Sequence, residues 1–293
     1  MDVKNHNTNR KKRVVRKRWN AAVLIALFVG ILLTVFRYFE FVSKTVYEES
    51  VSHLTEIFHQ SDNMLSELTN KNLTYLHIWG EYLQNTSDES EIREYIEKAQ
   101  EDAGFLDFYF LSADGNYKMA TGETGYLGLQ ENIEDEIRQG NDIVTNAALP
   151  GKSQLLVFAT PKPHGNYQGF EYDAIAIAYE NSDIVNVLNI SAFNGNAQSY
   201  VVHPDGRVVV DHSSEAWGEV YNFFGILREH SNMSEKEILK LSEEFKEGHT
   251  DAMLINLDGE DYYLVYEKSK PQDWIFLGLV QADIVNASMN RLQ

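Results

Sequence analysis

Several aromatic and charged side chains in the middle of the chain have the chemistry of a binding pocket. A phenol combines an apolar ring with one hydrogen-bonding end, which suits tyrosine to the wall of such a pocket. Five tyrosines lie in or beside strand-like runs: Tyr109, Tyr117, Tyr126, Tyr172 and Tyr179. Arg138 and Lys152 could supply a cation for a carboxylate ligand, and Asp173 could bind an amine. The alternative for each residue is a core aromatic or a surface charge.

The sequence contains no recognised motif of catalysis or metal binding. The chain has no cysteine, which excludes disulfides and thiolate chemistry. Residues 150–153 resemble the end of a phosphate-binding loop, but Asn146 stands where that motif requires glycine. No Gly-x-Ser-x-Gly elbow occurs, and the nine histidines lack metal-ligand spacing. The sequence therefore predicts neither a cofactor nor a metal, and an outer hydrolase remains only as an alternative.

The amino-terminal segment predicts a membrane anchor. Seven basic residues lie between Arg10 and Arg18, and residues 19–36 are then almost wholly apolar and carry no charge. As a helix these eighteen residues extend roughly 27 Å, close to the hydrocarbon thickness of a bilayer. Basic residues beside a span stay in the cytoplasm, so residues 37–293 are expected outside it. A cleaved signal peptide is the alternative, but its apolar core is shorter.

The charge distribution bears on the partners of the chain. The net charge is −19, and residues 1–18 hold eight of the 25 basic groups and one of the 44 acidic groups. The remainder therefore carries −26, which repels nucleic acid, while the basic tail suits anionic lipid headgroups. We expect a membrane partner and no nucleic-acid partner.

A long helix is predicted to follow the apolar segment. Apolar residues recur at helical spacing over residues 38–83, and neither proline nor glycine interrupts them before Gly80. Such a helix would extend roughly 69 Å. It predicts either a coiled-coil spacer or a mechanical link between an outer domain and the membrane. A long amphipathic helix also favours a homodimer, because any uncovered apolar stripe needs a partner.

Two mixed units of strands and helices are predicted after this stalk. Asp114-Gly115 and Asp205-Gly206 each join two strand-like runs, and a third such turn is Asp258-Gly259. Helices are expected from a capping-box-like start at Asp88 and from a capping box at Ser234. Strands 155–160 and 172–179 and a helix over 182–190 complete the first unit. Further helical faces are predicted around Trp217 to Leu227. The pattern indicates an α+β fold with antiparallel sheets.

This layout resembles the double Cache sensor, the outer ligand-binding region of many bacterial transmembrane receptors, which has two PAS-like modules. The amino-acid sequence is similar to the sensor halves of hybrid histidine kinases from anaerobic gut Firmicutes in three stretches: YEESVSHL at 47–54, FEYDAIAI at 170–177 and VHPDGRVV at 202–209. The resemblance covers nearly the whole chain.

The resemblance implies a domain order: a cytoplasmic tail over 1–18, a transmembrane helix over 19–36, a stalk helix over 37–85, a membrane-distal module over 86–190, a membrane-proximal module over 191–283, and an exit helix over 284–293 toward a second transmembrane segment. A small-molecule pocket is expected in the distal module, between its sheet and the loops of residues 119–154. The expected output is a cytoplasmic histidine kinase beyond this chain, with a diguanylate cyclase or a chemoreceptor as alternatives.

One feature of the resembling family is missing. Its amino-acid-binding branch carries an Arg-x-Trp pair near the distal pocket, and residues 126–139 contain no such pair. The sequence therefore does not identify the ligand as an amino acid.

Overall fold

The computed structural model describes most of the chain, namely residues 3–129, 133–148, 154–188, 197–212, 222–269 and 273–284. The chain divides into two compact units. One comprises Met1–Ser50 and Val285–Gln293, and the other is Val51–Ile284. Each unit is described separately below. Of the predicted exit helix, residues 285–293 fall outside the described residues, and so does the part of the predicted helical face before Asn222. The rest of that face, with Phe224 and Leu227, lies in a helix over Phe223–His230.

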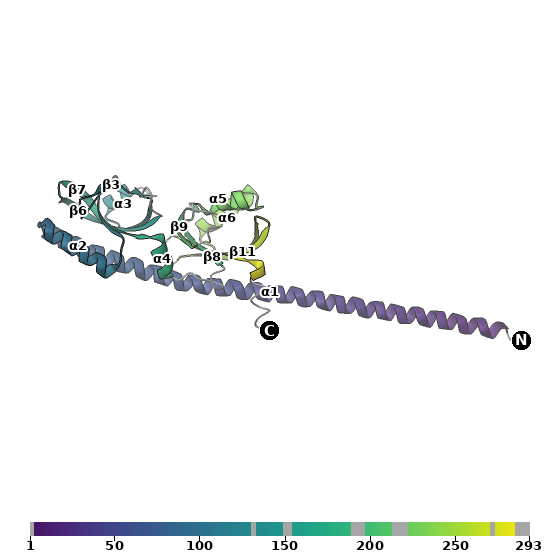
Figure 1. Cartoon of the computed structure of the whole chain (residues 1–293). Coiled ribbons are helices and arrows are strands. Elements are labelled where there is room, and N and C mark those ends of the chain that lie inside the picture. The colour runs from purple at the N-terminus through teal and green to yellow at the C-terminus, as the bar shows by residue number, and fades with distance from the viewer. Residues whose placement is uncertain are drawn as a thin grey trace. The chain divides into compact units, whose positions relative to one another are not determined.

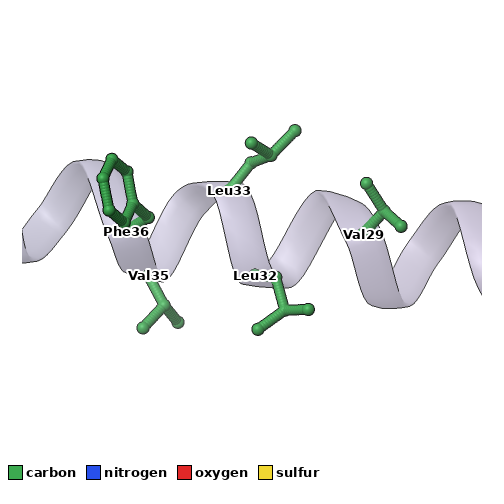
Figure 2. Close-up of a pocket in the computed structure, with 5 residues that line it drawn as sticks. All are labelled: Val29, Leu32, Leu33, Val35 and Phe36. Carbon is green, nitrogen blue, oxygen red and sulfur yellow. The ribbon is translucent and has the colours of Figure 1, made fainter.

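A single helix, α1, spans Val3–Asn85 (Figure 1). In the first unit its side chains are described continuously from Leu27 to Tyr38, and the large apolar ones among them are all exposed. Figure 2 shows Leu33 and Phe36 pointing to one side of the helix and Leu32 and Val35 to the other. Together with Val29 they line a hollow of about 420 Å³. Only this helix lines the hollow, so it is helix surface and not a binding cavity.

The predicted transmembrane segment, residues 19–36, lies within α1. Among the described residues, no helix has a stretch of the length and apolar character needed to cross a membrane. The structure does not describe the side chains of residues 19–26.

In the second unit, the rest of α1 is a spine on which two sheets pack. Phe58 stacks on Phe276 at 6.0 Å between ring centroids, and Trp79 lies 6.2 Å from Phe108. Leu65 between them is fully buried. Because these residues follow one face of the helix, the helix contacts both modules.

The spine also makes polar contacts with each module. Asp62 accepts a 2.5 Å hydrogen bond from Ser269, and His59 lies 3.1 Å from the carboxylate of Glu267. His77 approaches Asp142 at 3.0 Å. The first two contacts reach the proximal module and the third reaches the distal one, so each module is fixed to α1 by side-chain bonds as well as by packing.

The distal module is a seven-stranded antiparallel sheet of order β3-β2-β1-β7-β6-β5-β4. The turn at Asp114-Gly115 is the predicted hairpin turn, with Gly115 at a φ of 88° that favours glycine. The strands have these bounds: β1 Asp107–Leu111, β2 Asn116–Met119, β3 Thr124–Tyr126, β4 Gly128–Leu129, β5 Ile143–Ala148, β6 Leu155–Tyr167 and β7 Phe170–Glu180. Strand β5 was not predicted from the sequence.

Strand β6 is longer than the predicted 155–160. Its register with β7 shifts between Pro161 and Gly165 and then continues to Tyr167. Strand β5 pairs with β6 only as far as Ala159. Beyond that residue, at Pro161 and Pro163, no described strand forms hydrogen bonds with the β5 side of β6. Proline lacks an amide donor and is tolerated at such an edge, although it lowers the strand propensity seen in the sequence.

Three helices accompany the distal sheet: α2 Glu89–Ala103, α3 Glu134–Gln139 and α4 Asn181–Leu188. Asp88 caps α2 as predicted, accepting from the amides of Ser90 and Glu91. The Glu91 side chain does not complete a capping box, because its carboxylate accepts the hydroxyl of Tyr82 at 2.8 Å. Gly104 ends α2 in the left-handed conformation.

The proximal module is a five-stranded antiparallel sheet of order β10-β11-β12-β8-β9. Its strands are β8 Ala197–Val202, β9 Val208–His212, β10 Asp251–Leu257, β11 Glu260–Lys268 and β12 Ile275–Gln281. Helices α5 Phe223–His230 and α6 Glu235–Glu247 cover one face, with Phe223, Leu227 and Phe245 in the shared core. Ser234 and Glu237 form the predicted capping box. The predicted antiparallel α+β modules are thus confirmed.

Side-chain amides join the two modules along strand β9, the edge of the proximal sheet. Asn146 donates to the carbonyl of Val209 at 2.9 Å, and Gln154 donates to the carbonyl of Val208 at 2.9 Å. Asn181 bonds both the amide and the carbonyl of Asp211. An exposed edge is a site of unwanted pairing, and these amides cover it.

Candidate ligand-binding face of the distal sheet

The inner face of the distal sheet is the candidate site, and strand alternation decides which side chains form it. Residues two apart on a strand share a face, and residues paired across strands also share it. This rule groups Tyr109 on β1 with Ala176 on β7, and Ala159 on β6 with Ile143 on β5. All four belong to one buried apolar cluster, which Ile133 next to α3 also joins.

Small side chains line the central strands of this face. Ala174, Ala176 and Ala178 alternate along β7, and Ala159 and Ala147 face them from β6 and β5. A row of alanines at the centre of a sheet is unusual for a densely filled core, because larger residues bury more apolar area. This part of the buried face therefore carries little side-chain volume.

Two of the predicted tyrosines meet at this face. The rings of Tyr109 and Tyr117 lie edge to face with centroids 4.9 Å apart. The hydroxyl of Tyr109 donates to the Asp107 carboxylate at 2.9 Å. Burial, followed by the neighbouring negative charge of Asp107, raises the pKa of Tyr109 well above its usual value. The phenol therefore stays protonated and is a hydrogen-bonding group at neutral pH.

Thr145 contributes a second polar group that sequence reasoning missed. It pairs with Val157 across strands β5 and β6, so its side chain shares the inner face. Only 1% of Thr145 is exposed, and its hydroxyl has no hydrogen-bond partner among the described residues. A buried hydroxyl without a partner is costly, which makes Thr145 a natural contact for a ligand.

The other predicted site residues lie elsewhere. Tyr126 is 61% exposed on edge strand β3. Arg138 is an exposed residue of α3, bonded to Glu134 on the same helix. Asp173 accepts the amide of Ala113 at 3.0 Å and so holds the β1–β2 turn. Lys152 lies outside the described residues.

Tyr172 and Tyr179 are buried but do not join Tyr109. The ring of Tyr172 packs on Phe110, which faces the opposite side of β1 from Tyr109. Gly165 permits this position, since a Cβ there would lie 2.2 Å from the Tyr172 ring. Tyr179 donates to Asn72 of α1 at 3.0 Å. The structure thus groups Tyr109 and Tyr117 and places the other described candidates elsewhere. The ligand-binding role of these residues stays a prediction.

The polar groups identified among the described residues of the candidate face are the phenols of Tyr109 and Tyr117, the Thr145 hydroxyl and the Asp107 carboxylate that Tyr109 engages. Across the described residues, no three histidine, aspartate or glutamate side chains converge on a metal position. The arrangement is suited to binding by burial and hydrogen bonds.

Comparison with solved structures finds the same fold in outer sensor domains. The chain is similar to the extracellular domain of mmHK1S-Z3, a protein named as a histidine kinase, with a TM-score of 0.58, 14% identity, and coverage of 85% of this chain and 99% of that one. It is also similar to the sensory domain of the Campylobacter jejuni chemoreceptor Tlp3, solved with isoleucine, with a TM-score of 0.52, 12% identity, and coverage of 84% and 98%.

A third similar structure is the ligand-binding domain of the Pseudomonas aeruginosa chemoreceptor PctB in complex with L-Arg. The TM-score is 0.56 at 16% identity, with coverage of 80% of this chain and 97% of that one. No family model matches the sequence, and no curated protein matches it. The fold is therefore that of extracellular sensor domains of histidine kinases and chemoreceptors, which confirms the predicted sensor fold. An origin in Firmicutes stays a prediction.

Proposed function

We propose that this chain is the ligand-sensing region of a transmembrane signalling receptor and binds a small molecule on the inner face of its distal module. The observation that carries the proposal is the alanine-lined face with Tyr109 and Thr145, in a fold shared with sensor domains. The similar chemoreceptor domains were solved with isoleucine and L-Arg. By analogy, the ligand here is a small metabolite.

The chemical groups of the face limit the class of ligand that can bind there. The described inner-face residues offer apolar surface and hydroxyl groups, with Asp107 engaged by Tyr109. The missing Arg-x-Trp pair separates this chain from the amino-acid-binding branch of the family that it resembles. A ligand with an apolar body and hydrogen-bonding oxygen or nitrogen atoms suits these groups.

The proposed location is extracytoplasmic, with the chain anchored by residues 19–36. Support comes from the sequence pattern of a basic tail before an uncharged apolar stretch, and from the exposure of large apolar side chains such as Leu33 and Phe36. The basic tail over 1–18 would then lie at the cytoplasmic surface.

The proposed signal passes through α1. The spine helix contacts both modules, so a ligand that prefers one arrangement of the distal sheet biases the position of the helix. Helix shifts of about 1–2 Å are known in interface switches. The proposed receiver is a cytoplasmic histidine kinase, with a chemoreceptor or diguanylate cyclase output as alternatives, in a homodimer formed through the spine helices.

A thermal-shift screen of the full chain in detergent micelles against a metabolite panel tests the proposal. A ligand at about one hundred times its dissociation constant is expected to raise the melting temperature by roughly 5–10 °C. The Ala176→Phe variant, which fills the inner face, should lose this shift. If the panel produces no shift, or if Ala176→Phe responds as the wild type does, the proposal fails.

A further inference from the structure

A groove outside the inner face lies beside the spine helix. Its volume is about 600 Å³, and its walls come from α1, the carboxyl end of α2, the end of β7 and α4. Pockets for small molecules commonly have volumes of about 300–1,000 Å³. The groove does not share a lining residue with the alanine row of the distal face, so it is a separate place on the molecule.

One wall of the groove is apolar. Met64 and Leu68 lie one helical turn apart on α1 and both line the groove. Met64 is 40% exposed, which is a high value for a large apolar side chain in a folded unit. Its flexible thioether can adapt to the shape of an apolar ligand.

Tyr179 of β7 forms the floor of the groove and is bonded to α1 and to the end of α2. Tyr179 lines the groove while being buried, and its hydroxyl contacts Asn72 at 3.0 Å and the carbonyl of Ala103 at 3.3 Å. These contacts join β7 to α1 and to the end of α2. The floor is therefore preorganised, which lowers the entropic cost of binding.

The charge around the groove is mainly negative. Glu67 on α1 and Asp183 on α4 both line it. The carboxyl end of α2 reaches it at Gly104, and the last turn of α2 contains no basic residue to offset the partial negative charge of the helix end. The lining cation, Lys71, has its ammonium 5.6 Å from the ring centre of Tyr75 on the same helix.

We propose that this groove binds an organic ammonium ion with an apolar body. The ammonium lies between Glu67 and Asp183, and the apolar body packs on Met64 and Leu68. Such a ligand bridges the spine helix and α4. The first residue of α4, Asn181, bonds Asp211 of the proximal module. The site therefore goes beyond the ligand-binding face proposed above and uses different residues.

The test titrates the full chain in detergent micelles with 2-phenylethylamine by calorimetry, with neutral 2-phenylethanol as the matched compound. The amine should bind, and the alcohol should bind at least about fivefold more weakly, because it lacks the charge. The double variant Glu67→Gln, Asp183→Asn should lose about five- to twentyfold in affinity for the amine. Glu94→Gln, Glu97→Gln removes the same charge from the exposed side of α2 and should bind like the wild type.

Two further variants keep the test decisive. Met64→Trp fills the groove from an exposed helix position and should block the amine even if the charge variants fold poorly. Ala176→Phe fills the inner face and should leave the affinity unchanged, which separates this site from the ligand-binding face. No binding of the amine, equal binding of the alcohol, or loss of binding only in Ala176→Phe overturns the proposal.

A second copy of the chain is the rival occupant of the groove. Light scattering of the wild type and of Leu68→Lys at several protein concentrations distinguishes it. The proposal expects the same oligomeric state in both proteins. A wild-type dimer that dissociates in Leu68→Lys would identify the groove as an interface and overturn the ammonium site.

Discussion

Single side chains on the inner face of the distal sheet combine burial with unused hydrogen-bonding capacity. The Thr145 hydroxyl is buried without a partner among the described residues, while Thr160 on β6 donates to Asp142 at 2.7 Å. The two threonines therefore make a natural pair for comparison. The buried Thr145 hydroxyl has a desolvation cost that a ligand can offset, and the hydrogen bond of Thr160 stabilises the fold.

Replacing Thr145 by valine should raise stability and weaken ligand binding. The change removes a buried hydroxyl without altering the shape much, so the free energy of unfolding should rise by about 1 kcal/mol. Chemical denaturation measures this, and the ligand-induced thermal shift should fall. Thr160→Val should instead lower stability, because it leaves Asp142 without that donor. Equal destabilisation by both changes would mean that Thr145 has a bonding partner in the protein.

Stability should also depend on the tyrosines at high pH. Burial raises the pKa of Tyr179 to about 12, above the usual value of 10, and this outweighs the lowering effect of its bond to Asn72. A group whose folded-state pKa is raised contributes stability that is fully present below pH 10 and lost as the pH rises through 12. Unfolding followed by fluorescence between pH 9 and 12 should show this loss. Tyr179→Phe should have a shallower pH slope, and an unchanged slope would contradict the assignment.

At the scale of elements, the contacts that matter most join segments far apart in the sequence. Asn146, Gln154 and Asn181 bond the edge of β9 from the distal module. Asn146 is next to Thr145 on β5, so its strand contributes both to the candidate face and to the module junction. Alternation along one strand places the two side chains on opposite faces.

Asn181→Ala should weaken the junction between modules. The change leaves the amide and the carbonyl of Asp211 without their amide partner, at a cost of about 1–3 kcal/mol. Hydrogen exchange of β9 should speed up, and the unfolding midpoint should fall. Ser182→Ala, at the exposed neighbouring position on α4, serves as the control and should change little. If both variants behave alike, the Asn181 bonds do not stabilise the junction.

Local sequence signals account for the elements that were predicted correctly. Asp-Gly turns located the hairpins, and Gly206 and Gly259 do have positive φ values of 85° and 90°. Ser234 with Glu237 located α6. These motifs act within a few residues, so the sequence alone contains their physical cause.

The missed features depend on tertiary contacts. Strand β5 carries Thr145 and Asn146, whose polar side chains interrupt the apolar pattern expected of a central strand. The continuation of β6 through Pro161 needs an unpaired strand side that only the sheet order reveals. At the site, side-chain chemistry alone grouped eight residues, while the fold joins Tyr109 to Tyr117 and assigns Asp173 to a turn.

At the scale of the whole molecule, the proposed topology has the two ends of α1 on opposite sides of a bilayer. Since the chain has no cysteine, single cysteines can report on each side. A membrane-impermeant maleimide should label Glu97→Cys in intact cells, and should label Asn5→Cys only after lysis. The labelling ratio measured by gel shift gives the result. Labelling of Asn5→Cys alone in intact cells would reverse the proposed topology.

Hydrogen–deuterium exchange of the full chain, with and without a ligand found by the thermal-shift screen, tests ligand sensing by the distal module most directly. We expect slower exchange in β5, in β6 and in β7, the strands that form the inner face, together with a smaller change in the spine helix. Protection confined to the proximal module, or no protection in these three strands, would contradict it.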